Sequence, residues 1–168
     1  MDASKNPWQT AIDFVLSYEG GLVENPLDPG GLTNWGISSR SYPSLDIRNL
    51  TRDDAASIYK KDYWDAVHGD ELPGPLAVAV FDSAVNQGAG TAKRMLQIAL
   101  NVDADGIIGP RTIKAAHDGG LDAVVRFLAE RAVRYHETMR DVPGLNVFAH
   151  NWYFRLFSLA RIVMVGTN

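Results

Sequence analysis

The segment from Pro75 to Asn86 constrains the fold more than any other part of the sequence. Its apolar residues, among them Leu76, Val80 and Phe81, fall nearly all round a helix rather than along one stripe. Such a helix is typical of a buried central element that other elements surround. Gly88 is expected to end it. The chain must therefore supply several further elements that cover this helix.

The rest of the sequence supplies most of those elements as helices. Asn6-Pro7 is a typical helix start, and apolar residues at helical spacing follow until Gly20-Gly21 stops the helix. Thr51 with Asp54 three residues later predicts a capped helix through about Ala66. The apolar periodicity and the turn residues between the segments predict further helices at about 90–101, 109–117, 121–140 and 146–165. We therefore expect a mainly α fold.

One region interrupts the helical pattern. From Gly21 to Tyr42 no helical period is visible, and Pro26, Pro29 and repeated glycines mark turns. Glycine is favoured where the chain turns sharply or lets a ligand approach closely. Leu32 to Ile37 is the best candidate for a short strand or hairpin arm. A loop or hairpin region should therefore follow the first helix.

Length and composition narrow the class of protein. The chain has 168 residues, enough for one domain with its own core, and no linker or repeat divides it. It contains no cysteine, which excludes disulfides, thiolate chemistry and zinc sites with sulfur ligands. Its formal charge of −4 argues against nucleic acid as a partner, because such affinity depends on neutralising phosphates.

Neither end of the sequence predicts export or membrane insertion. Residues 1–6 lack a basic cluster followed by an apolar stretch, so no ordinary secretory signal is recognisable. The apolar tail segment, Trp152 to Val165, has fourteen residues and contains Arg155 and Arg161. A spanning helix needs about twenty apolar residues. We expect synthesis in the cytoplasm, no stable membrane insertion, and a core helix in the tail.

Glu19 is the first candidate for chemistry. It falls at the C-terminal end of the first predicted helix, directly before Gly20-Gly21. Because the helix dipole disfavours negative charge at this end, the position favours the protonated form that a proton donor needs.

Asp28 and Thr33 follow in the glycine-rich loop. Glycoside hydrolysis usually needs an acid to protonate the leaving oxygen and a carboxylate to steer a water or stabilise the sugar cation. Glu19 and Asp28 could supply both, and the Thr33 hydroxyl could position the water. Asp28 could instead organise an Asp-Pro-Gly turn, and Thr33 could be an ordinary strand residue. Spacing alone leaves inversion and retention both open.

Several motifs in order carry a family resemblance. The chain resembles glycoside hydrolase family 108, lysozyme-like N-acetylmuramidases of phages and bacteria, in the segments Glu19-Gly20-Gly21, Asp28-Pro29-Gly30-Gly31, Thr33-Asn34-Trp35-Gly36-Ile37, Tyr63-Trp64, Asn86-Gln87-Gly88 and Asp105-Gly106-Ile107-Ile108-Gly109-Pro110-Arg111-Thr112. The resemblance implies a lysozyme-like, mainly α fold with two lobes. The small β-hairpin or loop region would follow the first helix.

The resemblance also implies roles. Glu19 would be the general acid, and Asp28 and Thr33 would take the places of the aspartate and threonine in the catalytic trio of phage lysozymes. Residues 1–168 would form a single muramidase domain, with 1–100 as the catalytic part and about 101–168 as a helical part that resembles a peptidoglycan-binding segment. The substrate would be the β-1,4 bond between N-acetylmuramic acid and N-acetylglucosamine, cut without a cofactor.

A biological role follows from the same resemblance. We expect a monomeric endolysin that is made in the host cytoplasm, is released by a holin and acts on the periplasmic cell wall to lyse the cell. Two alternatives remain. A lytic transglycosylase needs only a single acid, and a wall-binding or secretion-assisting protein would keep the fold without cutting.

Aromatic and amide side chains are candidates for substrate contact. Trp35 and Tyr63 could line a saccharide site, because flat aromatic faces with polar edges suit sugar rings, although aromatics also fill cores. Trp64 is predicted to be a core residue. Asn86 could meet the N-acetyl groups of the substrate, or could cap its helix.

The remaining charged motifs predict structural roles. His68, His117, His136 and His150 lack the short spacing of a metal pair, so no metal site is expected. Residues 101–108 imitate the start of an EF-hand loop, but position twelve is threonine where glutamate is needed, so a turn before a helix is expected. A solvated face paired with Glu130 and Glu137 is expected for Arg126, Arg131, Arg134 and Arg140, and the alternative is that these arginines attract anionic peptidoglycan or membrane surfaces.

Overall fold

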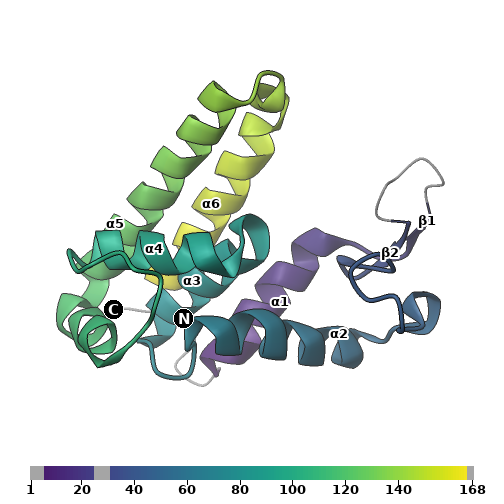
Figure 1. The fold of residues 1–168 in the computed structure, drawn as a ribbon, viewed down its shortest axis with the longest axis horizontal. Coiled ribbons are helices and arrows are strands. Elements are labelled where there is room, and N and C mark those ends of the chain that lie inside the picture. Colours follow the sequence, from purple (N-terminus) through teal and green to yellow (C-terminus); the bar gives the residue numbers. More distant parts are fainter. Residues whose placement is uncertain (1–5, 25–30, 166–168) are drawn as a thin grey trace.

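The computed structural model describes residues 6–24 and 31–165. The helices are α1 (Pro7–Glu19), α2 (Arg52–Tyr59), α3 (Gly74–Gln87), α4 (Ala89–Ala99), α5 (Pro110–Asp141) and α6 (Ala149–Met164). The strands are β1 (Val23–Glu24), β2 (Leu32–Asn34) and β3 (Ile37–Ser38). Short helical turns are η1 (Ile47–Asn49), η2 (Lys60–Trp64), η3 (Asp65–Val67) and η4 (Leu145–Phe148). The expected fold, mainly α with a small β region after the first helix, is confirmed (Figure 1).

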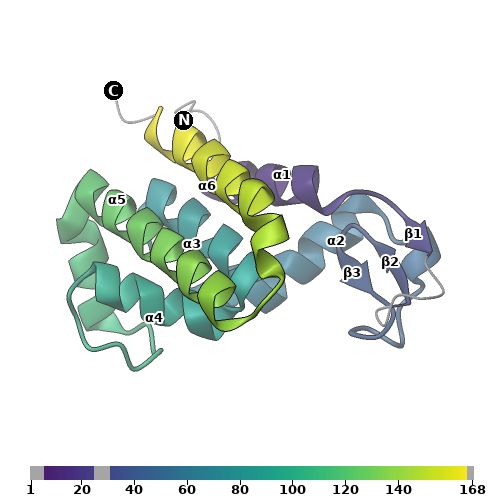
Figure 2. The same cartoon turned by 90° about the horizontal axis from the view of Figure 1, so that it is seen from above.

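The central element is α3. Every residue from Leu76 to Ala84 is buried, and the helix packs against α1, α4, α5 and α6. Seen from above, α3 lies between α4 and α6 (Figure 2). The strands gather at the other end of the molecule, which gives the two lobes (Figure 1). The apolar run in the sequence therefore identified the centre of the larger lobe correctly.

Helix α1 begins and ends where its sequence signals predicted. The side chain of Asn6 accepts a hydrogen bond from the backbone N–H of Trp8 at 3.0 Å, and Pro7 occupies the first helical position. Gly20 ends the helix with a φ of +71°, a conformation that glycine adopts readily. Glu19 is therefore the last helical residue.

The sheet has the order β1-β2-β3, with both pairs antiparallel. Trp35 and Gly36 form the tight turn between β2 and β3, and both have positive φ (53° and 77°), as a type I′ hairpin turn requires. The turn divides the segment from Leu32 to Ile37, which was expected to be a single strand or hairpin arm. The buried amide of Asn34 donates to the carbonyls of Ile47 and Leu50 at 3.1 and 3.2 Å. These bonds fix the sheet to η1.

The predicted helix from Thr51 to about Ala66 is present but changes its winding. Thr51 and Asp54 form the expected capping box at the start of α2. After Tyr59 the chain continues as one π-helical stretch, η2, and then as η3. Trp64 is buried as predicted, and its indole N–H donates to Asp70 at 2.8 Å.

Two predicted helices are joined in α5. Gly120 adopts φ 52° and ψ −142°, so the helix is interrupted where the sequence predicted the break between 109–117 and 121–140. The preceding EF-hand-like segment is a turn, as expected. The carboxylate of Asp105 accepts from the amide of buried Gln97 at 2.7 Å and from the N–H of Ile107 at 2.8 Å.

None of the helices in residues 6–24 and 31–165 combines the length and apolarity that a membrane span requires.

Candidate active site

The Glu19 side chain lies at the C-terminal end of α1 and is 23% exposed. Its Oε1 atom accepts a hydrogen bond from Nη1 of Arg155, on α6, at 3.2 Å. The guanidinium of Arg155 also lies over the Tyr18 ring, 5.0 Å from its centroid. Helices from opposite ends of the chain therefore hold this carboxyl group, while part of it still faces solvent.

The β2–β3 turn closes on the other carboxyl oxygen. A Cβ atom placed on Gly36 would lie 2.8 Å from Oε2 of Glu19 and 2.5 Å from the hydroxyl oxygen of Tyr59. That hydroxyl donates to the carbonyl of Trp35 at 3.1 Å. The turn therefore needs glycine at position 36 for two reasons, namely the positive φ and the close approach to Glu19.

Substituting alanine for Gly36 is expected to lower activity about 100-fold and to destabilise the protein by about 1–3 kcal/mol. The added methyl group must displace Glu19 or Tyr59, and small displacements at a reacting centre cost up to about two orders of magnitude in rate. Cleavage of peptidoglycan, the substrate that the family resemblance implies, and urea unfolding measure the two effects. Gly144→Ala is the matched control, because φ there is +94° but nothing lies within 4 Å of the added Cβ. Equal activity in both variants would contradict the positioning role.

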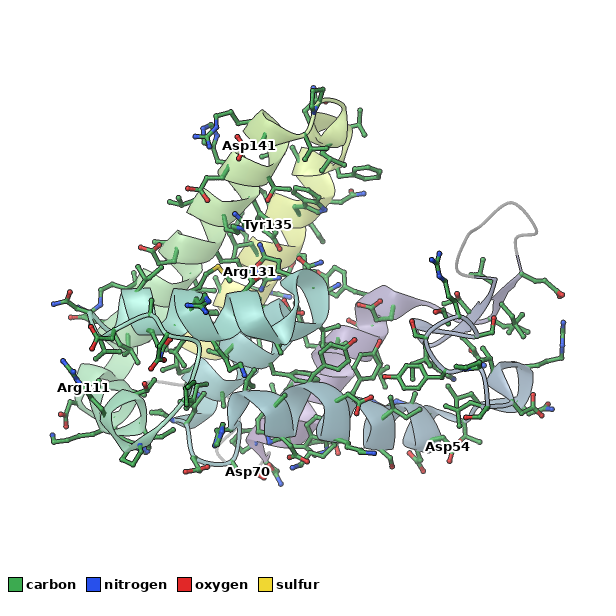
Figure 3. All side chains as sticks on the ribbon, viewed as in Figure 1. Asp54, Asp70, Arg111, Arg131, Tyr135 and Asp141 are labelled. Atoms are coloured by element: carbon green, nitrogen blue, oxygen red, sulfur yellow. The ribbon has the colours of Figure 1, made fainter. Side chains whose placement is uncertain are left out.

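Behind Glu19, Arg155 joins a buried charge network. Its Nε and Nη2 atoms donate to Oδ1 of Asp82, on α3, at 3.0 and 2.7 Å. Oδ2 of Asp82 lies 2.6 Å from Nη1 of Arg131, on α5, and both side chains are almost fully buried. Arg131 lies along α5 where that helix runs beside α6 (Figure 3). One carboxylate therefore holds two arginines together beneath the candidate site.

The charges of this network are fixed. Burial alone would raise the pKa of Asp82, but the guanidiniums of Arg131 and Arg155 outweigh it and lower that pKa, so Asp82 stays ionised. Burial likewise opposes the charge of Arg155, but Asp82 and Glu19 raise its pKa. A permanent cation therefore faces Glu19.

The prediction that the arginines of α5 form a solvated face is wrong at one position. Arg131 is fully buried, because it pairs with Asp82 rather than with the acids on its own helix. Arg134 is exposed and lies 3.5 Å from Glu137, as expected for a surface pair. The local spacing of charges could not distinguish these two arginines.

Two tyrosines lie close enough to Glu19 to feel its charge, and two further aromatic residues belong to the same lobe. The Tyr59 and Tyr63 rings lie 5.6 Å apart, and Tyr63 is half-buried. Burial, supported by the charge of Glu19, raises the pKa of both phenols, so they stay neutral. Trp35 is half-buried, and its indole N–H donates to the carbonyl of Leu50 at 3.2 Å. The hydroxyl of Tyr42 donates to Asp62 at 2.5 Å.

The other predicted site residues lie in different places. Thr33 is half-buried in the middle strand, between Val23 and Ser38. Asn86 is exposed at the end of α3, and its Oδ1 accepts from the hydroxyl of Tyr135 at 2.8 Å. Asp28 lies outside the described residues.

Sequence reasoning missed the groups that hold Glu19 in place, namely Arg155, Asp82, Arg131, Tyr59 and the close approach of Gly36. One signal was available. Asp82 is an acid within an otherwise apolar buried helix, and such a charge requires a partner. Within residues 6–24 and 31–165, no three His, Asp or Glu side chains gather closely enough to hold a metal ion.

Comparison with known proteins assigns the family. The profile described as Glycosyl hydrolase 108 matches residues 12–88, which include Glu19, Gly36 and Asp82. The solved structure of Brucella abortus SagA is similar along nearly the whole chain, with 30% identity, 94% coverage of each chain and a TM-score of 0.78. The chain belongs to glycosyl hydrolase family 108. Among curated proteins, none matches the sequence.

Membership of family 108 gives the site a chemical context. Family membership supports glycoside hydrolase activity on peptidoglycan, and the fold is lysozyme-like. In this family 108 protein, the matched segment carries the proposed acid and the turn that closes on it, whereas Arg131 and Arg155 come from the part of the chain beyond residue 88. Both parts of the chain therefore contribute to the surroundings of Glu19.

Proposed function

We propose that this family 108 protein is an N-acetylmuramidase that hydrolyses the β-1,4 bond between N-acetylmuramic acid and N-acetylglucosamine. The observation that carries the proposal is a partly exposed carboxyl group, Glu19, fixed between the Gly36 turn and Arg155. Glu19 would protonate the leaving glycosidic oxygen. Arg155 would then stabilise the carboxylate that remains after the proton leaves.

A second group must act on the sugar carbon. Asp28, with the hydroxyl of Thr33, is proposed to orient the water or to stabilise the developing positive charge. Trp35, Tyr63 and Asn86 are proposed to contact the substrate. The aromatic side chains offer flat faces for sugar rings, and the Asn86 amide offers N–H groups to a substrate carbonyl, whether of an N-acetyl group or of the attached peptide.

We propose an endolysin role for the whole chain. In this role the protein reaches the wall through a holin in the inner membrane and works there as a monomer. Residues 1–100 would form the catalytic part, and residues 101–168 a helical part that assists wall binding. The absence of cysteine and a charge of −4 support a protein that needs neither disulfides nor nucleic acid.

The chemical form of the products tests this proposal. Purified peptidoglycan should yield fragments that end in reducing N-acetylmuramic acid, which borohydride converts to the alcohol before mass spectrometry. A lytic transglycosylase would instead leave 1,6-anhydro ends that borohydride does not change. Anhydro products, reducing N-acetylglucosamine ends, or binding without any cleavage would each contradict the muramidase assignment.

A further inference from the structure

A pocket lies between α3, α5 and α6, apart from the groups that hold Glu19. Its volume is about 240 Å³, and it is lined by Asn86, Gln87, Arg134, Tyr135, Thr138 and Trp152. None of these lining residues is acidic. The pocket therefore combines one cation, two amides, a hydroxyl and two aromatic rings.

The aromatic part of the pocket is held rigidly. The rings of Tyr135 and Trp152 stack with centroids 5.2 Å apart and planes 29° apart, and Phe148 continues the stack beyond Trp152. The Tyr135 hydroxyl accepts a hydrogen bond from buried Arg131 at 3.1 Å and donates one to Asn86 at 2.8 Å. Figure 3 shows Tyr135 beyond Arg131 along α5. The buried charge network thus extends to this pocket.

The polar part of the pocket offers mainly hydrogen-bond donors. The carbonyl oxygen of Asn86 already accepts from Tyr135, and that of Gln87 accepts from Ser83 at 3.1 Å. Both amides therefore present their N–H groups for a ligand. Arg134 adds a positive charge, and its 3.5 Å contact with Glu137 is long for an ion pair. Donors and a cation without a lining acid favour a ligand that carries carboxylate and carbonyl oxygens.

Two helices, α3 and α6, connect the pocket with the groups that hold Glu19. On α3, Asn86 follows Asp82 by one turn, and on α6, Trp152 precedes Arg155 by one turn. Asp82 binds Arg155, which binds Glu19. One helical turn advances about 5.4 Å. The pocket therefore lies about one turn of helix from the network that fixes the acid.

We propose that this pocket binds the acidic peptide stem carried by the muramic acid beside the cleaved bond. The inference rests on the proposed muramidase function, since that function places muramic acid near Glu19. Arg134 pairs with a free carboxylate of the stem, and the amides of Asn86 and Gln87 donate to peptide carbonyls. The partly exposed ring of Trp152, which Tyr135 holds in place, packs against the apolar side chains of the stem. The protein would then favour stem-bearing glycan over bare glycan.

Binding to two probes tests the inference. The full chain carrying Glu19→Gln, which leaves the probes uncut, is titrated with a peptidoglycan disaccharide that bears its peptide and with the same disaccharide after amidase removal of the peptide. We expect about tenfold tighter binding of the first probe, and less difference in high salt because salt screens an exposed arginine. Adding Arg134→Gln should remove the preference. Adding Arg126→Gln, an exposed arginine earlier on α5, should leave it unchanged.

Other results would overturn the pocket assignment. Equal affinity for both probes, binding of neither, or a preference that survives Arg134→Gln would each do so. If Arg134→Gln weakens both probes equally, the pocket holds sugar rather than peptide. Reducing-end release by the unmutated protein separates the two proposals. Cleavage without stem preference rejects the pocket alone, whereas stem preference without cleavage by the active chain rejects the muramidase function.

Discussion

Replacing Asp82 with asparagine is expected to destabilise the protein by about 3–5 kcal/mol, the usual cost of breaking a buried ion pair. Asparagine keeps the shape of the side chain but removes its negative charge. Arg131 and Arg155 would then stay buried without the carboxylate that neutralises them. Globular proteins are stable by only about 5–15 kcal/mol, so much of the total would be lost. The midpoint of urea unfolding measures the effect.

An exposed ion pair provides the control for this change. Asp103 is 87% exposed at the side chain and lies 3.4 Å from Arg111, so Asp103→Asn should leave the unfolding midpoint unchanged. If Asp82→Asn also left it unchanged, the network would not be the structural centre that its geometry suggests.

The same carboxylate links stability to pH. The folded protein lowers the pKa of Asp82, so its contribution is present above the ordinary carboxyl pKa of about 3.9 and is lost as pH falls through that value towards the lower pKa of the folded state. The difference in unfolding free energy between the original protein and Asp82→Asn should therefore be constant near neutral pH. It should shrink under strongly acidic conditions.

Periodicity in the sequence identified the central helix but not its charge pairing. The apolar run around Phe81 predicted a buried helix, and α3 is buried along its length. Asp82 lies within that run, yet its partners are 49 and 73 positions away, on α5 and α6. Ion pairing across such distances depends on how helices pack, which local spacing does not encode. Arg131 was misassigned for this reason, since its own helix offered acids at suitable spacing.

The candidate site shows the same division between local and tertiary information. The first helix begins after Asn6 at Pro7 and ends before Gly20-Gly21, so Glu19 could be placed at its end from the sequence. The turn at Gly36 was not predicted, because it lies inside the segment from Leu32 to Ile37 that was expected to be a single strand or hairpin arm. The residues that this turn faces could not be predicted either, because its contact with Tyr59 and Glu19 arises only when the turn packs against α1 and α2.

Substituting glutamine for Glu19 is expected to lower the rate of peptidoglycan cleavage by about 10²- to 10⁴-fold, the usual contribution of a positioned general acid. Glutamine has nearly the same shape but cannot donate the required proton. The fold should persist, because the side chain is partly exposed and Arg155 keeps both of its bonds to Asp82. Glu71→Gln, an exposed glutamate paired with His68, is the matched control and should retain full activity.

The most direct measurement compares the rate of reducing-end release from purified peptidoglycan by the unmutated protein, Glu19→Gln and Glu71→Gln, each shown to be folded by circular dichroism. The account predicts rapid release by the first and third proteins and a loss of at least about 100-fold for Glu19→Gln. Equal release by all three proteins would contradict the assignment of Glu19 as the acid.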